Sequence, residues 1–486
     1  MSKTIKYIGT QTRWSELAVT GKQSTWSPDA TDERSDTEAA QLLATGQFSD
    51  VDATLLPEQK VVQISGVVSG AWNPLLATGG AVNRPLKKFT DSIGVTVANS
   101  GTAATHTVET GPWGGLAYKV ALGTGNTYTE VQLAGRNIAN FNGHVSWRVW
   151  VEDYTKFGQL TAYAGVSGYT RLYQNNHILG TSNTNRFNGE QQVICGPTRA
   201  VAANTFVGGT DTMADCKLRI TSGGTNGGIL WIDSATVPGV GRPTHVITHD
   251  DSSVTWIANA LPYLAAAGLT ATFGVYTSAL NTAPTINLTS DQVAKIAAAG
   301  HQISSHNVNN YPLDNGIIVD VNKQTAAAYT ADFVSASAVL SAIVGQKFDS
   351  TYHPWVQGSH SQAAFDTMRA AGVAIARGVD SGHNFPQVGL GHGALVLKTQ
   401  ALHTMTQPQI LAAVEATKTY GLTTFWMVHE ITEAGGVGVE TSIANYAYLC
   451  SLIGADVAAG RAVHRTAAQL GREVYAERLV PAALLA

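Results

Sequence analysis

The sequence predicts a multidomain protein with an N-terminal adaptor segment (1–60), a jelly-roll-like β-sandwich (61–242) and a distorted parallel (β/α) barrel (243–486). Three observations support this division. The length of 486 residues exceeds what one hydrophobic core usually serves. Short runs that alternate apolar and polar residues fill the middle of the chain, which indicates strands. After Arg242, apolar strands alternate with Ala-rich amphipathic helices.

Composition narrows the function classes. Charged residues make up only 13% of the chain, so Ser, Thr, Asn and Gly supply most of the polar surface, which suits sugars or an extracellular setting. The net charge is -4 and no Lys/Arg run could follow a phosphate backbone, which excludes nucleic acid as a favoured partner. No stretch reaches the ~20 apolar residues of a membrane span, and residues 1–10 lack the apolar core of a signal peptide.

The adaptor segment is polar, is rich in Asp, Glu and Arg at 29–40, and has one short helical pattern at Thr37 to Thr45. It has two interpretations, a flexible leader or a segment that orders when it docks on a partner. The three cysteines are too few for a disulfide framework or a Cys-based zinc site, and we expect them to be buried thiols: Cys195, Cys216 and Cys450.

The β-sandwich is predicted from strands that Gly and Asn clusters separate at regular spacing, among them 116–122, 144–153 and 216–222. No helix of useful length is expected here. Exposed aromatic residues in such a sandwich could stack on sugar rings, which leaves carbohydrate binding or trimerisation as functions of this part. Trp147, Trp150 and Trp231 sit in alternating strands, and we predict that they belong to the core.

The barrel is predicted from a repeated order of strand and helix, which gives a parallel sheet with its chemistry at the carboxyl ends of the strands. The expected strands are 245–248, 269–276, 301–306, 373–379, 395–399 and 423–429. The expected helices lie near 254–267, 290–299, 324–344, 361–371 and 407–420.

Polar side chains follow several of these strands. Asp250 and Asp251 end the first strand, where one carboxylate could bind a divalent cation and the other could accept a proton from water; capping of the next helix is the alternative role. His306 and Asn310 are four residues apart after another strand and could reach one ion. A satisfied polar residue is the more common role for a single His at a strand end.

Three further clusters complete the predicted rim. Pro354 stiffens the approach to Trp355, whose backbone N–H could point at a developing oxyanion. Arg377 and Asp380 could hold a catalytic group by ion pairing, or could form a surface salt bridge. His429 follows the last strand, where an imidazole could protonate a leaving group or simply hydrogen-bond.

The order of these motifs resembles the polysaccharide deacetylases, carbohydrate esterase family 4 with the NodB homology domain, over about Pro243 to Leu470. The family's TFDDG and ATFF-like strand are similar to THDDS and LTATFGVY here, its GHEIGNHTxxH to GHQISSHNVNN, its RPPYG to YHPWV and its LxLH to WMVHE. The segment 452–470 resembles the family's closing helix and short strand. The resemblance implies a distorted β/α barrel that hydrolyses acetyl amides or acetyl esters on a polysaccharide.

The resemblance also assigns roles. It implies Asp250 as general base, His429 as general acid, the Trp355 N–H as oxyanion donor, and Asp251 and His306 as metal ligands. Asn310 stands where the family has its second metal His, which implies a harder ligand set for the divalent ion. We expect zinc, with cobalt, nickel or manganese as alternatives. Ser252 replaces the motif's Gly, and Tyr352 replaces the arginine that tethers the base, a role that Arg377 could take over.

Residues 7–48 are similar to leader segments of bacteriophage and prophage structural proteins. That likeness implies a tail fibre or tailspike, bound through this segment to tail or baseplate proteins, commonly a homotrimer, and located on the virion at the host surface. The main hypothesis is therefore a deacetylase acting on acetylated bacterial O-antigen, capsule or exopolysaccharide. The alternatives are a receptor-binding fibre that recognises sugar without turnover, and a secreted polysaccharide or xylan esterase.

Overall fold

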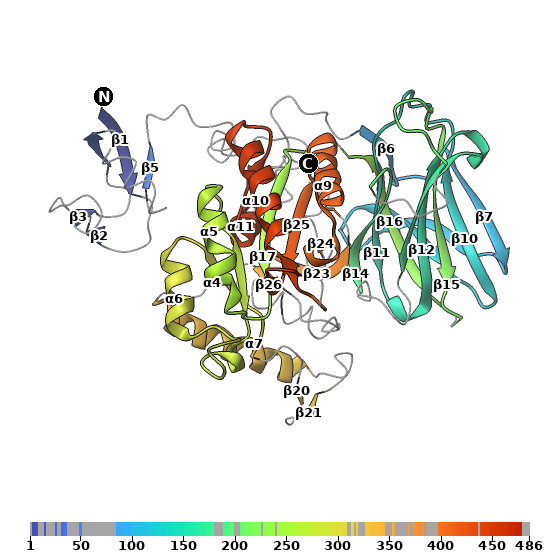
Figure 1. Ribbon diagram of the computed structural model, residues 1–486. Helices are drawn as coiled ribbons and strands as arrows, with labels where there is room; N and C mark the ends of the chain where they lie inside the picture. Colours follow the sequence, from blue (N-terminus) through green and yellow to red (C-terminus); the bar gives the residue numbers. More distant parts are fainter. Residues whose placement is uncertain are drawn as a thin grey trace. The chain divides into compact units, whose positions relative to one another are not determined.

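The computed structural model describes residues 2–7, 14–15, 25–26, 31–35, 48–50, 84–178, 188–198, 205–224, 227–238, 241–308, 313–314, 317–318, 326–345, 352–354, 368, 373–381, 383–384, 397–435 and 438–478 (Figure 1). The chain divides into two compact units, Met1–Pro74 with Ala483–Ala486, and Leu75–Ala482. The predicted boundaries at residues 60 and 242 stay predictions.

The first unit contains short antiparallel strands. Strand β1 (Ser2–Tyr7) pairs with β4 (Thr31–Ser35) and β5 (Phe48–Asp50), and β2 (Trp14–Ser15) pairs with β3 (Thr25–Trp26). The helical pattern predicted at Thr37 to Thr45 lies outside the described residues. Neither interpretation of this segment, leader or adaptor, is tested by these strands.

The second unit begins with two antiparallel sheets. The five-stranded sheet has the order β13 (Leu172–Ile178), β12 (Phe157–Gly165), β15 (Asp215–Ser222), β10 (Asn126–Leu133) and β7 (Val95–Gly101). The other has the order β14 (Gly189–Cys195), β11 (Val145–Val151), β16 (Ile229–Val237), β9 (Leu116–Ala121) and β8 (Thr105–Thr110), with β6 (Arg84–Lys88) also paired to β16. The helical residues described here are two single turns, η1 (Tyr154–Lys156) and η2 (Ser167–Tyr169).

Apolar side chains of both sheets form one core. Alternate residues of each strand point inward, so Val131 and Leu218 of one sheet share a cluster with Val149 and Leu230 of the other. This packing makes the sheets a sandwich, while its jelly-roll order stays a prediction. The three cysteines are free and buried, as predicted.

The predicted tryptophans separate into two sets. Trp147 is fully buried between the sheets, as predicted. Trp150 and Trp231 alternate with inward-facing residues, so they lie on the opposite face of the six-stranded sheet, where Trp231 is buried and Trp150 half-buried. Their assignment to the sandwich core is therefore corrected: strand parity places them on its outer face.

The remainder of the second unit is built on a curled parallel sheet. Its order is β19 (Gln302–Ser305), β18 (Thr272–Val275), β17 (Thr244–His249), β25 (Thr423–Val428), β24 (Leu397–Ala401), β23 (Ile375–Ser381) and β22 (Tyr352–Pro354), and β28 (Val463–His464) also pairs with β17. The two outermost strands in this order, β19 and β22, lie next to each other, so the sheet curls toward a barrel. All six predicted strands are confirmed. Strand β22 was not predicted, because a strand of three residues is too short to show an alternation of apolar and polar residues.

Helices pack against this sheet (Figure 1). They are α4 (Thr255–Asn259), α5 (Leu261–Ala266), α6 (Ser290–Ala298), α7 (Ala326–Val344), α9 (Gln407–Tyr420), α10 (Ile443–Ala458) and α11 (Ala467–Arg478). The short elements are η3 (Thr277–Ala279), β20 (Leu313–Asp314), β21 (Ile317–Ile318), η7 (Leu402–Thr404), β26 (Ile431–Thr432) and β27 (Thr441–Ser442). Among the described helices, none is both long and apolar enough to cross a membrane.

Local sequence explains where these helices begin and break. Thr289 forms a capping box with Gln292 and starts α6. The single helix predicted at 254–267 is two helices, because Pro262 lies in the first turn of α5 and has no N–H to continue the α4 hydrogen-bond ladder. The helix predicted at 361–371 lies outside the described residues except for residue 368.

Two apolar clusters hold the sheet and its helices. The larger one joins strand residues such as Phe273 and Trp426 to Ile296 of α6 and Tyr446 of α10. The smaller one brings Val246, Ile375 and Phe425 of the strands together with Ala467 and Leu470 of α11. The strands are therefore fixed from both faces, which keeps their carboxyl ends in place.

Gly421 ends α9 in the left-handed conformation, with φ of 57°. A Cβ there would lie 2.0 Å from the carbonyl oxygen of Gly241. We expect Gly421→Ala to lower the free energy of unfolding by about 2–5 kcal/mol, the sum of the left-handed penalty and the overpacking. Gly460→Ala is the matched control: Gly460 has φ of 67° and no neighbour within 4 Å of a Cβ, so about 1–2 kcal/mol is expected in denaturant unfolding. Equal losses in both variants would contradict the clash.

Candidate active site

The predicted polar residues meet at the carboxyl edge of the parallel sheet. Asp250 and Asp251 directly follow β17, His306 follows β19, His429 follows β25, and Arg377 lies within β23. Parallel strands end at the same edge, which is where barrels of this kind hold their reactive groups. The structure brings all five side chains into one group.

The innermost pair is an ion pair between Asp250 and Arg377. Nη2 of Arg377 lies 2.5 Å from Oδ1 and 2.6 Å from Oδ2 of Asp250, and its Nη1 donates to the carbonyl of Gly378 at 3.1 Å. Arg377 is fully buried and Asp250 is 2% exposed. A surface salt bridge, the alternative interpretation of Arg377, is therefore wrong. The side chain of Asp380, predicted to act with Arg377, lies outside the described residues.

This pairing keeps the Asp250 carboxylate ionised. Burial alone raises the pKa of a carboxyl group, because it removes water from the charged form. The positive charge of Arg377 and its hydrogen bonds, together with the nearby His306 and His429, outweigh burial and hold the pKa of Asp250 below its ordinary value. A buried, ionised carboxylate can accept a proton, which is what a general base requires.

Asp251 and His306 form a second pair. Nε2 of His306 lies 3.4 Å from Oδ1 of Asp251. Burial alone lowers the pKa of His306, and the neighbouring carboxylates Asp251 and Asp250 raise it overall. The Asp251 side chain keeps 28% of its surface exposed, whereas that of His306 keeps 4%. This pair therefore lies between the buried ion pair and solvent.

The backbone that presents Asp251 is in the left-handed region, with φ of 77° at Asp251 and 56° at Ser252. Non-glycine residues adopt this conformation at a cost, so surrounding contacts must hold it. The Ser252 hydroxyl accepts the N–H of Tyr276 at 3.0 Å, and its carbonyl accepts the N–H of Leu288. The turn thus forms although Ser252 replaces the glycine of the family motif.

Neither aspartate caps the following helix. Helix α4 begins at Thr255 after Val254, and the Thr255 N–H bonds to the Ser253 hydroxyl at 3.3 Å. The capping alternative for Asp250 and Asp251 is therefore wrong. Both carboxylates are available to the group at the sheet edge.

His429 faces both aspartates. Its Nε2 lies 4.0 Å from Oδ2 of Asp250 and 3.9 Å from Oδ2 of Asp251. Its carbonyl accepts the indole N–H of Trp256 at 2.6 Å, and its ring meets that of His403 edge-on at 5.7 Å. Trp256 and His403 could not be predicted as neighbours of His429, because they lie in segments distant along the chain.

The described residues fit part of a metal site. The 3.4 Å between Asp251 Oδ1 and His306 Nε2 is close to the separation of two tetrahedral ligands, roughly 3.3 Å for bonds of about 2.0–2.1 Å. Asn310, the third predicted ligand, lies outside the described residues, as does Trp355. Within the part of the chain that the structure describes, no three His, Cys, Asp or Glu side chains are arranged so that they could hold one metal ion.

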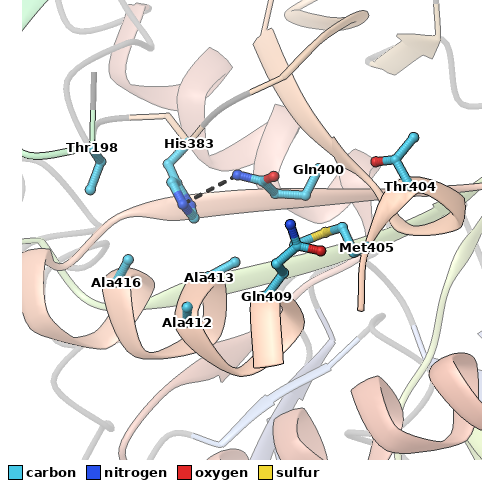
Figure 2. A pocket seen from close by; sticks show the side chains of 9 residues that line it. All are labelled: Thr198, His383, Gln400, Thr404, Met405, Gln409, Ala412, Ala413 and Ala416. Atoms are coloured by element: carbon cyan, nitrogen blue, oxygen red, sulfur yellow. Dashed lines mark hydrogen bonds between the residues drawn. The ribbon is translucent and has the colours of Figure 1, made fainter. Parts of the chain in front are cut away.

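An open hollow of about 460 Å³ shares no residue with this group. It is lined by Thr198, His383, Gln400, Thr404, Met405, Gln409, Ala412, Ala413 and Ala416, and Figure 2 shows His383 bonded to Gln400. The other ring nitrogen of His383 bonds to Thr424, and Gln409 is engaged in capping α9. His383, Gln400 and Gln409 of the hollow are thus already hydrogen-bonded within the fold.

Comparison with known proteins identifies the domain that holds Asp250, Asp251 and His306. Residues 239–376 match the sequence profile of the family described as Polysaccharide deacetylase. These residues form a polysaccharide deacetylase domain. The predicted enzyme class, a hydrolase, agrees with this domain. The profile match ends before Arg377 and His429, which join the group at the sheet edge by geometry alone. No curated protein sequence matches this chain significantly.

Similar solved structures include several deacetylases. A de-N-acetylase from Aggregatibacter actinomycetemcomitans is 20% identical, with 27% of this chain and 62% of that chain covered and a TM-score of 0.24. A Streptococcus pyogenes deacetylase in complex with acetate is 18% identical, with 32% and 62% covered and a TM-score of 0.27. A family 4 acetyl xylan esterase from Clostridium thermocellum, in complex with a cobalt ion, is 14% identical, with 49% and 93% covered and a TM-score of 0.32. This chain thus spans less than two thirds of the first two proteins.

Proposed function

We propose that this protein removes acetyl groups from bacterial surface polysaccharide in a reaction that depends on a divalent metal ion. The observation that carries the proposal is the buried Asp250–Arg377 pair within 4.0 Å of His429. An ionised carboxylate and an imidazole lie at the same sheet edge, where they can act as base and acid on one acetyl group. The deacetylase domain supports the choice of substrate class.

The proposed roles follow from position and charge. Asp250 accepts a proton from the attacking water, because Arg377 keeps its carboxylate ionised. His429 donates a proton to the departing amine or hydroxyl oxygen as the tetrahedral intermediate collapses. The backbone N–H of Trp355 donates to the oxyanion. Acetate and a deacetylated sugar are the products.

Asp251, His306 and Asn310 would hold the ion. When bound, it would polarise the acetyl carbonyl and make water more acidic. One imidazole and two oxygen donors form a harder set than two imidazoles, which admits manganese or cobalt as well as zinc and nickel. The spacing of Asp251 and His306 supports this assignment.

We expect acetate release from acetylated polysaccharide to stop when a chelator removes the ion. Full-length protein would be dialysed against chelator, assayed by acetate release, and assayed again after addition of zinc, cobalt, nickel or manganese. Restored release identifies the preferred ion. Release that persists in metal-free protein would contradict metal dependence. Binding to host polysaccharide without acetate release under any metal would favour a receptor-binding fibre instead.

We further propose that the protein is part of a bacteriophage tail, attached through its N-terminal segment to tail or baseplate proteins, as a trimer at the host surface. The similarity of residues 7–48 to phage leader segments supports this context. Mass spectrometry of purified virions tests it. Virions that lack the chain would favour the secreted esterase.

A further inference from the structure

Three tryptophans gather on the outer face of the six-stranded sheet, opposite the sandwich core. Strand pairing places Trp150 of β11 directly beside Trp231 of β16, and Trp231 beside Lys119 of β9. On the other side of Trp150, Glu190 of β14 is its register partner. The ring of Trp113 meets the ring of Trp150 edge-on at 6.0 Å. We call Trp113, Trp150 and Trp231 the tryptophan row.

Hydrogen bonds and cations fix the rings of this row. The indole N–H of Trp113 donates to Glu190 at 2.8 Å, and that of Trp231 donates to Glu152 at 2.7 Å. The Arg148 guanidinium lies 5.0 Å from the Trp113 ring centre and also binds both oxygens of Glu190, at 2.9 and 3.0 Å. The rings of Trp113 and Trp231 are therefore held before any ligand arrives, which reduces the entropy lost on binding.

The row keeps apolar surface in contact with water. Trp113 and Trp150 are half-buried although they face away from the core. Flat, immobilised indole rings with polar groups at their edges suit pyranose rings, which offer an apolar face and a rim of hydroxyls. The neighbouring carboxylates of Glu190 and Glu152 can accept hydrogen bonds from those hydroxyls.

The charges around the row favour an uncharged ligand. Arg148 pairs with Glu190, and Lys119 pairs with Glu109 at 3.4 Å. Both cations are thus already matched by carboxylates, and Glu152 adds a further negative charge at Trp231. An acidic polymer would meet these carboxylates, so charge complementarity selects a neutral glycan.

We propose that the tryptophan row is a binding site for neutral acetylated polysaccharide, which it holds for the deacetylase domain. The inference rests on the proposed function for the identity of the polymer. Because the row belongs to the sandwich and the reacting groups to the barrel, loss of the row should weaken attachment to a polymer and leave the chemical step unchanged.

The test uses full-length protein with two neutral probes, acetylated xylan and oligomers of N-acetylglucosamine, and one acidic probe, polygalacturonate. Trp150→Ala and Trp113→Ala should each weaken binding of at least one neutral probe about tenfold or more in affinity electrophoresis and tryptophan-quenching titrations. Trp150→Phe should recover part of the loss because it restores a ring. Tyr128→Ala, which removes a half-buried aromatic residue from the other sheet, should bind like the parent protein.

Binding is measured in Asp250→Asn protein, so the result does not depend on turnover. Kinetics in the active protein then separate the two proposals: loss of the row should raise KM for the polymer and leave kcat for a short acetylated oligosaccharide unchanged. Failure of both neutral probes to bind the parent protein overturns the site, as does undiminished binding by Trp150→Ala or tighter binding of polygalacturonate. Binding of a neutral probe without acetate release would support the tryptophan row as a binding site and contradict the proposed deacetylation.

Discussion

Replacement of Asp250 by Asn is expected to lower kcat for acetate release by about 10²–10⁴-fold, the range for loss of a general base. The amide has the shape of the carboxylate and keeps one oxygen that can accept from Arg377, but it cannot take a proton from water. The substitution leaves the Arg377 cation buried without a counter-charge, so the free energy of unfolding should fall by up to about 3–5 kcal/mol, and denaturant unfolding shows whether the variant is folded under the assay conditions. Initial rates of acetate release at saturating substrate measure the effect.

Asp251→Asn separates the two adjacent carboxylates. Asp250 is 2% exposed and tied to Arg377, whereas the Asp251 side chain is 28% exposed and lies 3.4 Å from His306. We therefore expect Asp250→Asn to retain its bound metal after dialysis and Asp251→Asn to lose much of it, as elemental analysis would show. If both variants lost metal equally, or if Asp250→Asn kept its turnover, the division of roles would be wrong.

Local sequence patterns predicted the strands and most helices of the parallel sheet, but not the features that depend on how these elements pair. The predicted helix 407–420 is α9, residue for residue, because Thr406 and Gln409 cap one end and Gly421 the other. The predicted strands agree because buried parallel strands read as short apolar runs. The break before α5 was missed, although Pro262 was the signal. Nothing local marked β22, whose existence depends on pairing with β23.

Only part of the candidate site could be predicted from the sequence, for a related reason. A motif order points to Asp250, Asp251, His306 and His429, because each ends a strand whose position can be predicted. Arg377 had two interpretations, since burial and its carboxylate partner 127 residues away are set by the sheet order. For the same reason, the hydrogen bond from the Trp256 indole N–H to the carbonyl of His429 could not be predicted. Asn310 and Trp355 lie outside the described residues and stay predictions.

Arg377→Ala is expected to reduce both stability and activity. The substitution leaves the Asp250 carboxylate buried without its cation, and breaking a buried ion pair typically costs about 3–5 kcal/mol. Arg461→Ala is the matched control. Arg461 also pairs with a buried carboxylate, Asp456, but the Arg461 side chain is 55% exposed and Asp456 keeps Lys418 as a second partner. The control should lose at most about 1 kcal/mol in denaturant unfolding.

The sign of the pH dependence distinguishes an electrostatic role from packing. In the parent protein the pKa of Asp250 is lowered, so its contribution to stability is present above the unfolded-state pKa and is lost as the pH falls through the folded-state pKa. Without Arg377, burial remains as the main influence and raises the pKa of Asp250. The stability deficit of Arg377→Ala should then grow as the pH rises from acid toward neutral, and the acid limb of kcat/KM should move to higher pH.

Arg377→Lys separates charge from geometry at the same position. Lysine restores a cation, but its single ammonium group cannot both bind the Asp250 carboxylate and reach the Gly378 carbonyl as the two terminal nitrogens of Arg377 do. Stability should therefore recover in part while the pH profile returns toward that of the parent protein. A deficit of Arg377→Ala that does not change with pH, or an acid limb that stays in place, would mean that Arg377 acts through packing alone. In that case the ionised state of Asp250 would need another source, and the assignment of Asp250 as the base would lose its physical support.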